Sequence, residues 1–306
     1  MADPCCLACR SPDVAHWATA RDVEYASVAD SFDYVRCADC GSLSIAHPPV
    51  DRLGEIYPES YYSFSGGSRS LAERVKQRLD KRMFRKLFAG LPGKELAALD
   101  VGGGTGWLLS LAREVEPRLT HTAVVDIDAK AKPEAEALGH DFHLGRIEGF
   151  ESGRKFDLIL LLNLIEHVDD PVAVLAKMRS LLAPGGRILV KTPNHDSLDS
   201  RLFRNRSWGG LHAPRHWVLF TPESFARAAG SAGLAVERTS LTQGAPFWAV
   251  SILEWLSRRG LVRIDRARPM VRHPLFGPLL AGFAAFDLAR RPFARTSQMF
   301  VRLSAA

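Results

Sequence analysis

No cysteine follows residue 40 in this chain of 306 residues, and all five cysteines lie within the first 40 residues. The sequence also lacks the run of about 18 to 20 apolar residues that a membrane-spanning helix needs. Its first residues, Met1 to Cys6, include neither a basic stretch nor an apolar one, so no secretory signal is predicted. We therefore expect a cytoplasmic protein, in which disulfide bonds are uncommon.

Internal repeats are absent, which argues against a fibrous or solenoid protein. Apolar residues make up 46% of the chain and charged residues 24%, which is typical of a globular protein and not of a disordered one. The net charge of +6 leaves anionic partners open, among them nucleotides, RNA and membrane surfaces. That charge is too small and too evenly spread to choose among them.

The cysteines form two Cys-x-x-Cys pairs, Cys6 with Cys9 and Cys37 with Cys40. Two such pairs supply the four sulfur ligands of a tetrahedral Zn²⁺ site and leave no open position on the metal. The spacing therefore predicts a structural zinc in a small zinc-ribbon-like module, with a β-hairpin within residues 23–35. Cys5 competes with Cys6 as the first ligand, and free thiols in a core or a pair of disulfides are the alternatives.

From residue 96 onward, short apolar strands alternate with helices, which predicts an α/β fold with a doubly wound, Rossmann-like parallel sheet. The predicted strands are 97–101, 122–126, 156–162, 187–192 and 234–241. The predicted helices are 70–90, 107–115, 129–138, 171–182, 221–232 and 247–256. We expect three parts: a zinc module with an aromatic linker (1–66), the α/β domain (67–245) and a C-terminal helical segment (246–306).

A glycine-rich turn follows the first of these strands, with the pattern Asp100-x-Gly102-x-Gly104-x-Gly106. Glycines allow positive φ angles and let a ligand lie against bare backbone. A dinucleotide-binding turn would have glycine or alanine where this chain has Trp107, and a phosphate-binding Walker loop would need Gly-Lys-Ser/Thr. Both classes of nucleotide site are therefore excluded.

The same pattern resembles the first motif of class I S-adenosylmethionine (SAM)-dependent methyltransferases. Matches to later motifs of the family follow in order over residues 96–195, at 125–128, 156–159 and 181–187. The resemblance implies that the glycines hold the methionine and ribose parts of SAM and that a carboxylate binds the ribose diol. The cofactor-binding residues that it implies are Asp100, Gly102, Gly104, Gly106, Asp126, Ile127 and Asn163, with Asp128 as the alternative to Asp126.

Glu166 and His167 follow the strand at 156–162 and resemble a Glu-His pair in two methyltransferase groups. In ubiquinone-pathway O-methyltransferases a Glu-x-x-Glu-His run helps to hold a divalent metal, but here its first position is Asn163. In zinc-containing sugar C-methyltransferases the pair lies beside the substrate. Their N-terminal halves combine two Cys-x-x-Cys pairs with a Tyr-Pro-x-x-Tyr-Tyr stretch, which residues 57–62 match. They also have a substantial C-terminal domain for which this chain has no room.

The resemblance implies His167 as the base that deprotonates the acceptor, with Glu166 orienting it. A purely structural histidine is the alternative. Tyr61, in the aromatic stretch, and His195, after the strand at 187–192, complete the candidate catalytic set. The loop at 208–217 resembles one in methyltransferases of sugars and polysaccharides, which implies substrate-binding roles for Trp208, His212, Arg215 and His216. In the alternative interpretation the two histidines only hold the loop in place.

Residues 247–286 are apolar and are interrupted by basic residues, which is typical of a helical lid, a dimer face or a segment on a membrane surface. We favour the lid or the homodimer face. If the segment contacts a membrane, the protein lies peripherally at its inner face.

We therefore expect a SAM-dependent methyltransferase that acts on a sugar, sugar nucleotide, polysaccharide or related natural product. Two alternatives remain. One is an RNA methyltransferase, against which speaks the absence of a dense basic stripe interleaved with aromatic residues. The other is a non-catalytic SAM-binding scaffold, against which speak the intact glycine and acidic motifs.

Overall fold

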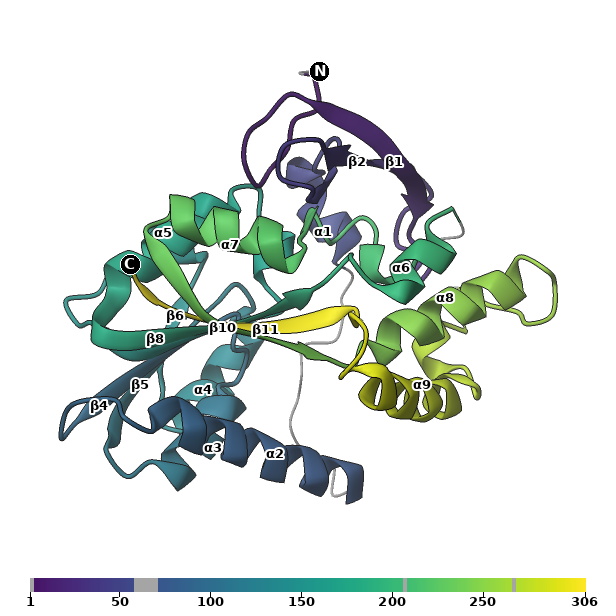
Figure 1. Cartoon of the computed structure of the whole chain (residues 1–306). Coiled ribbons are helices and arrows are strands. Elements are labelled where there is room, and N and C mark those ends of the chain that lie inside the picture. Colours follow the sequence, from purple (N-terminus) through teal and green to yellow (C-terminus); the bar gives the residue numbers. More distant parts are fainter. Residues whose placement is uncertain (1–2, 58–70, 206–207, 266–267) are drawn as a thin grey trace.

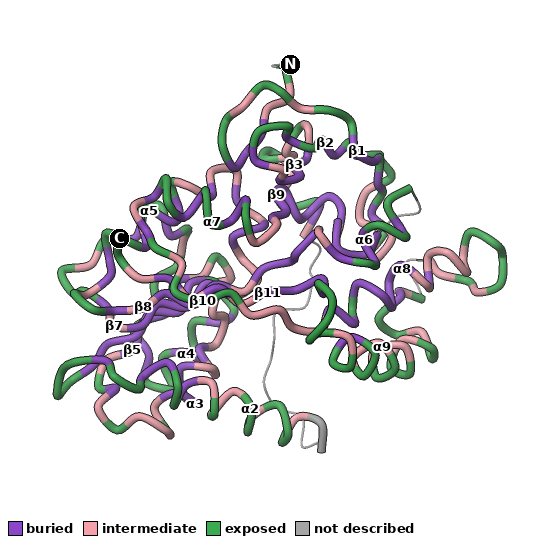
Figure 2. Tube along the Cα trace, in the orientation of Figure 1, coloured by how far each residue is buried: buried purple, intermediate pink, exposed green. Residues whose placement is uncertain are grey.

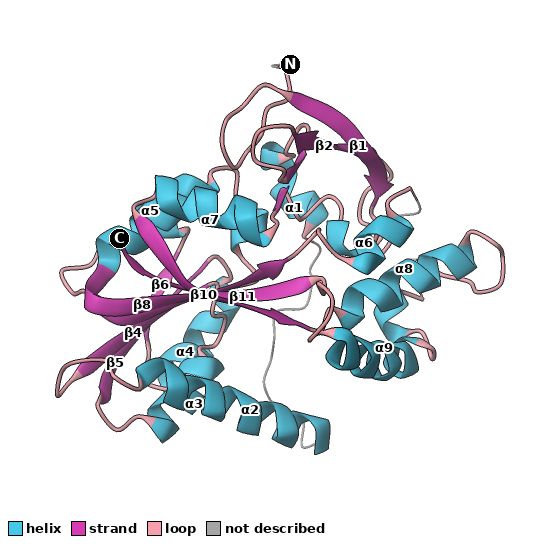
Figure 3. Cartoon of the chain, in the orientation of Figure 1, coloured by secondary structure: helices cyan, strands magenta, loops and turns pink. Residues whose placement is uncertain are grey.

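The computed structural model describes residues 3–57, 71–205, 208–265 and 268–306 (Figure 1). Tyr61 lies outside these residues. A large central sheet has helices on both of its faces, and a smaller sheet lies beside it (Figures 1 and 3).

The strands are β1 (Val14–Arg21), β2 (Ser31–Cys37), β3 (Leu43–Ile45), β4 (Leu96–Val101), β5 (Leu119–Asp126), β6 (Asp141–Leu144), β7 (Phe156–Leu162), β8 (Leu182–Pro193), β9 (Val218–Leu219), β10 (Leu234–Thr242) and β11 (Gln298–Ala305). The helices are α1 (Leu53–Ile56), α2 (Leu71–Phe88), α3 (Trp107–Val115), α4 (Lys132–Ala137), α5 (Pro171–Leu181), α6 (Leu198–Phe203), α7 (Pro222–Ser231), α8 (Ala245–Ser257) and α9 (Phe276–Arg290).

The large sheet has seven strands in the order β10-β11-β8-β7-β4-β5-β6. The strands from β6 to β8 run parallel, as the sequence predicts, but β11 is antiparallel to both β8 and β10. The α/β, Rossmann-like prediction is therefore confirmed in a mixed sheet. The boundary at residue 246 is wrong for the last strand, because β11 lies inside the sheet and does not belong to a separate helical segment.

Alternate residues of the central strands face two different layers, as the period of a β-strand requires. Leu158 and Leu160 of β7 pack on the side of α2 and α3, while Ile159 and Leu161 pack on the side of α5 and α7. All of β4 is buried, and Figure 2 shows the central strands as the buried middle of the molecule. Burial on both faces explains why these strands read as continuous apolar runs.

The N-terminal module forms a second sheet in the order β1-β2-β3-β9. Its last strand comes from the segment between α6 and α7, where Leu43 of β3 pairs with Leu219 of β9. The predicted hairpin is present, but its strands are β1 and β2, and residues 23–30 form the connection between them. The module is therefore joined to the rest of the chain through a shared sheet.

The C-terminal helices α8 and α9 pack against each other, with the rings of Trp248 and Phe283 stacked at 4.7 Å between centroids. In the part of the chain that the structure describes, no helix is long and apolar enough to span a bilayer.

Candidate active site

The glycine turn between β4 and α3 offers bare backbone at one position in particular. Gly102, Gly104 and Gly106 have φ angles of 72°, 54° and 72°, which favour glycine. A Cβ on Gly102 would lie 2.5 Å from Leu164, and one on Gly106 would lie 2.5 Å from His140. A Cβ on Gly104 would meet no atom within 4 Å. Gly104 therefore faces open space, while the other two allow close packing around it.

Asp126, at the end of β5, is held by the backbone beside this turn. Its Oδ2 accepts from the Gly104 N–H and its Oδ1 from the Asp128 N–H, both at 2.8 Å. A carboxylate has further lone pairs, so it remains able to accept from a diol. The neighbouring Ile127 is 67% exposed and adds an apolar surface to the same edge.

Asp100 lies beneath the turn, with its carboxyl group packed against Gly103. It is buried, and its Oδ2 has no hydrogen-bond partner among the described residues. Burial, with a smaller contribution from the negative charge of Asp126, raises the pKa of Asp100 to about 8.

The loop after β7 lies against the glycine turn, because Leu164 contacts Gly102. Asn163 begins this loop with a φ of 55°, and its N–H donates to the Lys191 carbonyl at 2.8 Å. The expected cofactor residues thus lie at the carboxyl ends of the neighbouring strands β4, β5 and β7. An open glycine cradle, a fixed carboxylate and an orphaned buried carboxyl oxygen are features that fit SAM.

Glu166 lies in a single 3₁₀ turn, Ile165–His167, that follows β7. Its Oε2 accepts from the Thr192 hydroxyl at 3.0 Å, and its Oε1 lies 4.0 Å from Nε2 of His216. The side chain is 1% exposed, and burial raises the pKa of Glu166 to about 7. This carboxyl can therefore gain or lose a proton near neutral pH.

His167 is held by one ring nitrogen. Its Nδ1 lies 3.0 Å from the Arg215 carbonyl and 2.9 Å from the Tyr57 hydroxyl. Because a carbonyl only accepts, Nδ1 donates the hydrogen there, and Nε2 keeps the free lone pair. Burial, followed by the charge of His212, lowers the pKa of His167 to about 3, so the ring is neutral. The expectation that Glu166 orients His167 is wrong, because Tyr57 and the Arg215 carbonyl do so.

His212 and His216 lie beside His167. The ring centroids of His167 and His216 are 4.8 Å apart, and those of His212 and His216 are 4.9 Å apart. Nδ1 of His216 donates to the Gly210 carbonyl at 2.8 Å, and Nδ1 of His212 lies 2.6 Å from the Glu24 carboxylate. The structure thus brings the predicted base and two predicted substrate-binding residues into one histidine cluster: His167, His212 and His216.

Trp208 and Arg215 have structural positions, so their predicted roles at the acceptor are wrong. Trp208 is 1% exposed, and its indole N–H donates to Asp199 at 2.8 Å. Arg215 is fully buried and pairs with the equally buried Asp22 at 2.9 Å. Neither side chain offers a free surface to a ligand.

His195 is also engaged elsewhere. Its Nε2 donates to the Gly41 carbonyl at 2.9 Å, which ties the end of β8 to the residue after Cys40. Burial lowers the pKa of His195 to about 4. This contact does not support the predicted catalytic role, because the nitrogen serves the N-terminal module.

The four sulfur atoms of Cys6, Cys9, Cys37 and Cys40 lie within 4.8 Å of one another. The separations are 3.5 Å from Cys6 to Cys40 and 3.6 Å from Cys9 to Cys37. Zinc–sulfur bonds of about 2.3 Å in a tetrahedron place sulfurs about 3.8 Å apart, so these residues fit a zinc ion. Cys5 is not in this group. Glu166, His167 and His216 also lie within 4.8 Å of one another, and Nδ1 of each histidine donates to a backbone carbonyl, so that Nε2 is the nitrogen left for a proton or a metal ion.

Sequence analysis missed four residues of the site: Thr192, Tyr57, Glu24 and Asp22. Only Tyr57 had a signal, since it begins the aromatic stretch at 57–62. The other three act through partners 26 to 193 positions away in the sequence, a separation that no local pattern reveals.

Comparison with known proteins identifies the family to which the chain belongs. The chain matches the model of a methyltransferase domain over residues 71–239 and belongs to this family. This match confirms the predicted class of domain, a methyltransferase, and the open glycine cradle with the fixed Asp126 carboxylate fits the predicted cofactor SAM.

Curated relatives include a ubiquinone biosynthesis O-methyltransferase of Cereibacter sphaeroides (strain KD131), 33% identical over 131 residues, which are 40% of this chain and 51% of that protein. One of Parvibaculum lavamentivorans is 35% identical over 112 residues, which are 34% and 42% of the two chains. The chain thus spans about half the length of these relatives. Coclaurine N-methyltransferase, bound to N-methylheliamine and S-adenosylhomocysteine, has the same fold: its TM-score is 0.51 at 16% identity, over 85% of this chain and 82% of that one.

These relatives do not confirm the resemblance to sugar C-methyltransferases or a role in polysaccharide biosynthesis.

Proposed function

We propose that this protein transfers the methyl group of SAM to a hydroxyl oxygen of its acceptor, with His167 as the base. When bound, SAM supplies a methyl group on a positively charged sulfur. The residues of the chain must then align the hydroxyl with that methyl group and accept its proton. The observation that carries the proposal is the neutral His167, fixed through Nδ1, on the loop that packs against the glycine turn.

In this reaction the hydroxyl oxygen forms a bond to the methyl carbon as the carbon–sulfur bond breaks. The hydroxyl proton moves to Nε2 of His167, which becomes an imidazolium. Burial opposes this imidazolium, as the low pKa of His167 shows, so the step requires the ionised form of Glu166, which lies in the same cluster, to stabilise the positive charge. His212 and His216 are the remaining polar groups of the cluster that would contact the acceptor.

For the acceptor we propose a sugar, sugar nucleotide, polysaccharide or related natural product. The paired cysteines with the aromatic stretch, and the loop at 208–217, support this choice through their resemblance to enzymes that act on sugars. A phenolic hydroxyl is the second candidate, because the curated relatives are named ubiquinone biosynthesis O-methyltransferases.

The test uses SAM labelled in its methyl group and two acceptor panels, one of sugar nucleotides and one of simple catechols. We expect label in one panel, a loss of about 100-fold or more in His167→Asn, and SAM affinity unchanged in that variant. His47→Asn, at an exposed position, is the matched control. Full activity in His167→Asn, or transfer only to nitrogen or carbon acceptors, would refute the proposal.

We also propose that Cys6, Cys9, Cys37 and Cys40 hold a structural Zn²⁺. Their tetrahedral spacing supports it, as does the Cys40 N–H, which points at the Cys37 sulfur at 3.4 Å. Native mass spectrometry of the whole chain should find one zinc per protein, and none in a Cys37→Ser variant.

A further inference from the structure

The outward face of α9 has no polar side chain, which is unusual for a helix at the surface of a protein that is surrounded by water. Of its 15 residues, those classed as exposed are all apolar or glycine: Gly277, Pro278, Ala281, Gly282, Ala285, Phe286, Leu288 and Ala289. Leu288 is 51% exposed and Phe286 is 44% exposed, and Phe293, just beyond the helix, is 90% exposed.

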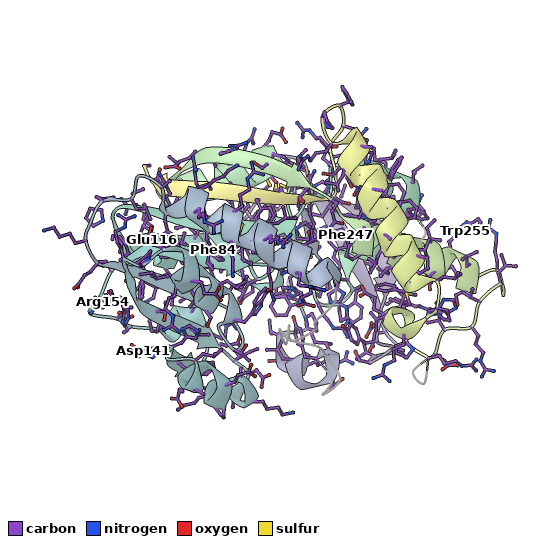
Figure 4. The ribbon with its side chains drawn as sticks, turned by 90° about the horizontal axis from the view of Figure 1, so that it is seen from below. Phe84, Glu116, Asp141, Arg154, Phe247 and Trp255 are labelled. Atoms are coloured by element: carbon purple, nitrogen blue, oxygen red, sulfur yellow. The ribbon has the colours of Figure 1, made fainter. Side chains whose placement is uncertain are left out.

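The opposite face of α9 is the one that packs on α8, through the stacked rings of Phe283 and Trp248. Seen from below, α9 lies in front of α8, and Trp255 marks the far end of α8 (Figure 4). Apart from Phe286, whose ring also contacts Trp248, the bare face of α9 therefore points away from its own partner helix, and no other described element covers it.

Positive charge surrounds this apolar face. Residues 245–295 contain nine arginines and three acidic residues, and of these arginines Arg295 pairs with Asp196 and Glu223 from outside this range. Arg272 and Arg291 are exposed at the two ends of α9, and Arg259 lies beyond the end of α8. No described carboxylate forms an ion pair with any of these three arginines.

We propose that the α8–α9 hairpin docks on an anionic membrane surface, with the bare face of α9 in the headgroup region and the arginines on lipid phosphates. An apolar helix face with basic flanks is the arrangement that anionic bilayers bind. A second copy of the chain would bring the same exposed arginines, Arg259, Arg272 and Arg291, towards each other and be repelled. A nucleic acid would satisfy the arginines but leave the apolar face in water.

Vesicle flotation of the whole chain, without SAM or acceptor, tests this surface independently of the proposed reaction. We expect binding to vesicles of phosphatidylcholine with phosphatidylglycerol, weaker binding at high salt, and none to phosphatidylcholine alone. Leu288→Ser with Phe293→Ser should lower the partition coefficient by about tenfold or more for each residue. Arg272→Gln with Arg291→Gln should lower it by about fivefold for each charge.

Leu79→Ser is the matched control for the apolar variants, because Leu79 is 60% exposed on α2. Lys86→Gln with Lys94→Gln is the control for charge, and circular dichroism checks the fold of each variant. Absence of flotation would overturn the proposal, and so would an equal loss in the control variants. A dimer at micromolar concentration that Phe293→Ser dissociates would show that a second copy covers the face instead.

Discussion

Two carboxyl groups of the site, Asp100 and Glu166, are hidden from water, and their surroundings give them different properties. Thr192 donates a hydrogen bond to Glu166, whereas Oδ2 of Asp100 has no partner among the described residues. Burial raises the pKa of both groups, to about 7 for Glu166 and about 8 for Asp100. Asp100 is therefore protonated at neutral pH in the folded chain.

This raised pKa predicts a pH effect on stability. In the unfolded chain Asp100 loses its proton near pH 3.8, but in the folded chain it does so only near pH 8. Between these values the folded state holds one more proton, so stability falls as pH rises, by at most about 1.4 kcal/mol per pH unit. The Asp100→Asn variant lacks this term, so its free energy of unfolding should fall less than that of the wild type from pH 5 to 8. Parallel pH curves in urea denaturation would contradict the raised pKa.

At the scale of single elements, two glycines allow the effect of backbone strain to be distinguished from the effect of blocked ligand access. One is Gly104, in the turn between β4 and α3, and the other is Gly90, outside it. Gly104 and Gly90 both have positive φ, 54° and 78°, so alanine costs about 1–2 kcal/mol at either position. A Cβ on Gly104 projects into the open cradle, whereas one on Gly90 would lie 3.9 Å from Arg187.

Gly104→Ala should therefore weaken SAM binding by tenfold or more. Gly90→Ala should lower the free energy of unfolding by about as much as Gly104→Ala does, and it should leave the affinity for SAM unchanged. Isothermal titration with SAM and thermal unfolding of both variants measure the two effects. Equal affinities in the two variants would show that the cradle is not the cofactor site.

The N-terminal module acts on the site through the loop at 208–217. The Tyr34 hydroxyl donates to the carbonyls of Leu211 and His216, and Glu24 holds His212. The glycine turn belongs to the other sheet. Disorder in the module should therefore disturb the histidine cluster and spare the cofactor residues.

Removal of the proposed zinc with a chelator, or the Cys37→Ser variant, should abolish methyl transfer and expose the module to proteases. SAM affinity should stay within about twofold. Cys5→Ser is the matched control, because Cys5 lies outside the group of four sulfurs. Normal activity in metal-free protein would contradict the prediction that the N-terminal module positions the histidine cluster.

At the scale of the whole molecule, the end of the chain completes the large sheet. β11 pairs with β8 on one side and with β10 on the other, and Met299, Val301 and Leu303 are buried. Without β11, strands β8 and β10 would have no shared partner, and the backbone N–H and C=O groups that now pair with β11 would be left without hydrogen bonds in the sheet.

A chain that ends before residue 298 should therefore fail to fold and be recovered as aggregate. A deletion of only the final residue, Ala306, which follows the strand, should be tolerated. Solubility and near-ultraviolet circular dichroism distinguish the two. A folded, SAM-binding truncated chain would show that β11 is dispensable.

The parts of the fold that were predicted are those with a strong local signal. Strand β4, the glycine turn and α3 follow from an apolar run, spaced glycines and helical periodicity within twenty residues. β6 was missed because its four residues have no buried side chain, and β11 because its partners lie more than 50 residues away. The functions given to Trp208 and Arg215 failed because a sequence does not show which side of a loop faces the core.

The sequence alone determined the class of the protein, because the spaced glycines and the carboxylates at the strand ends form motifs that can be read within short segments of the chain. The spacing of the cysteines also predicted the group of four sulfur atoms that the structure brings together. Only the tertiary structure decided the histidine cluster, the partners of Glu166 and the bare face of α9. Those depend on contacts between distant segments, whose geometry is set by how the whole core packs.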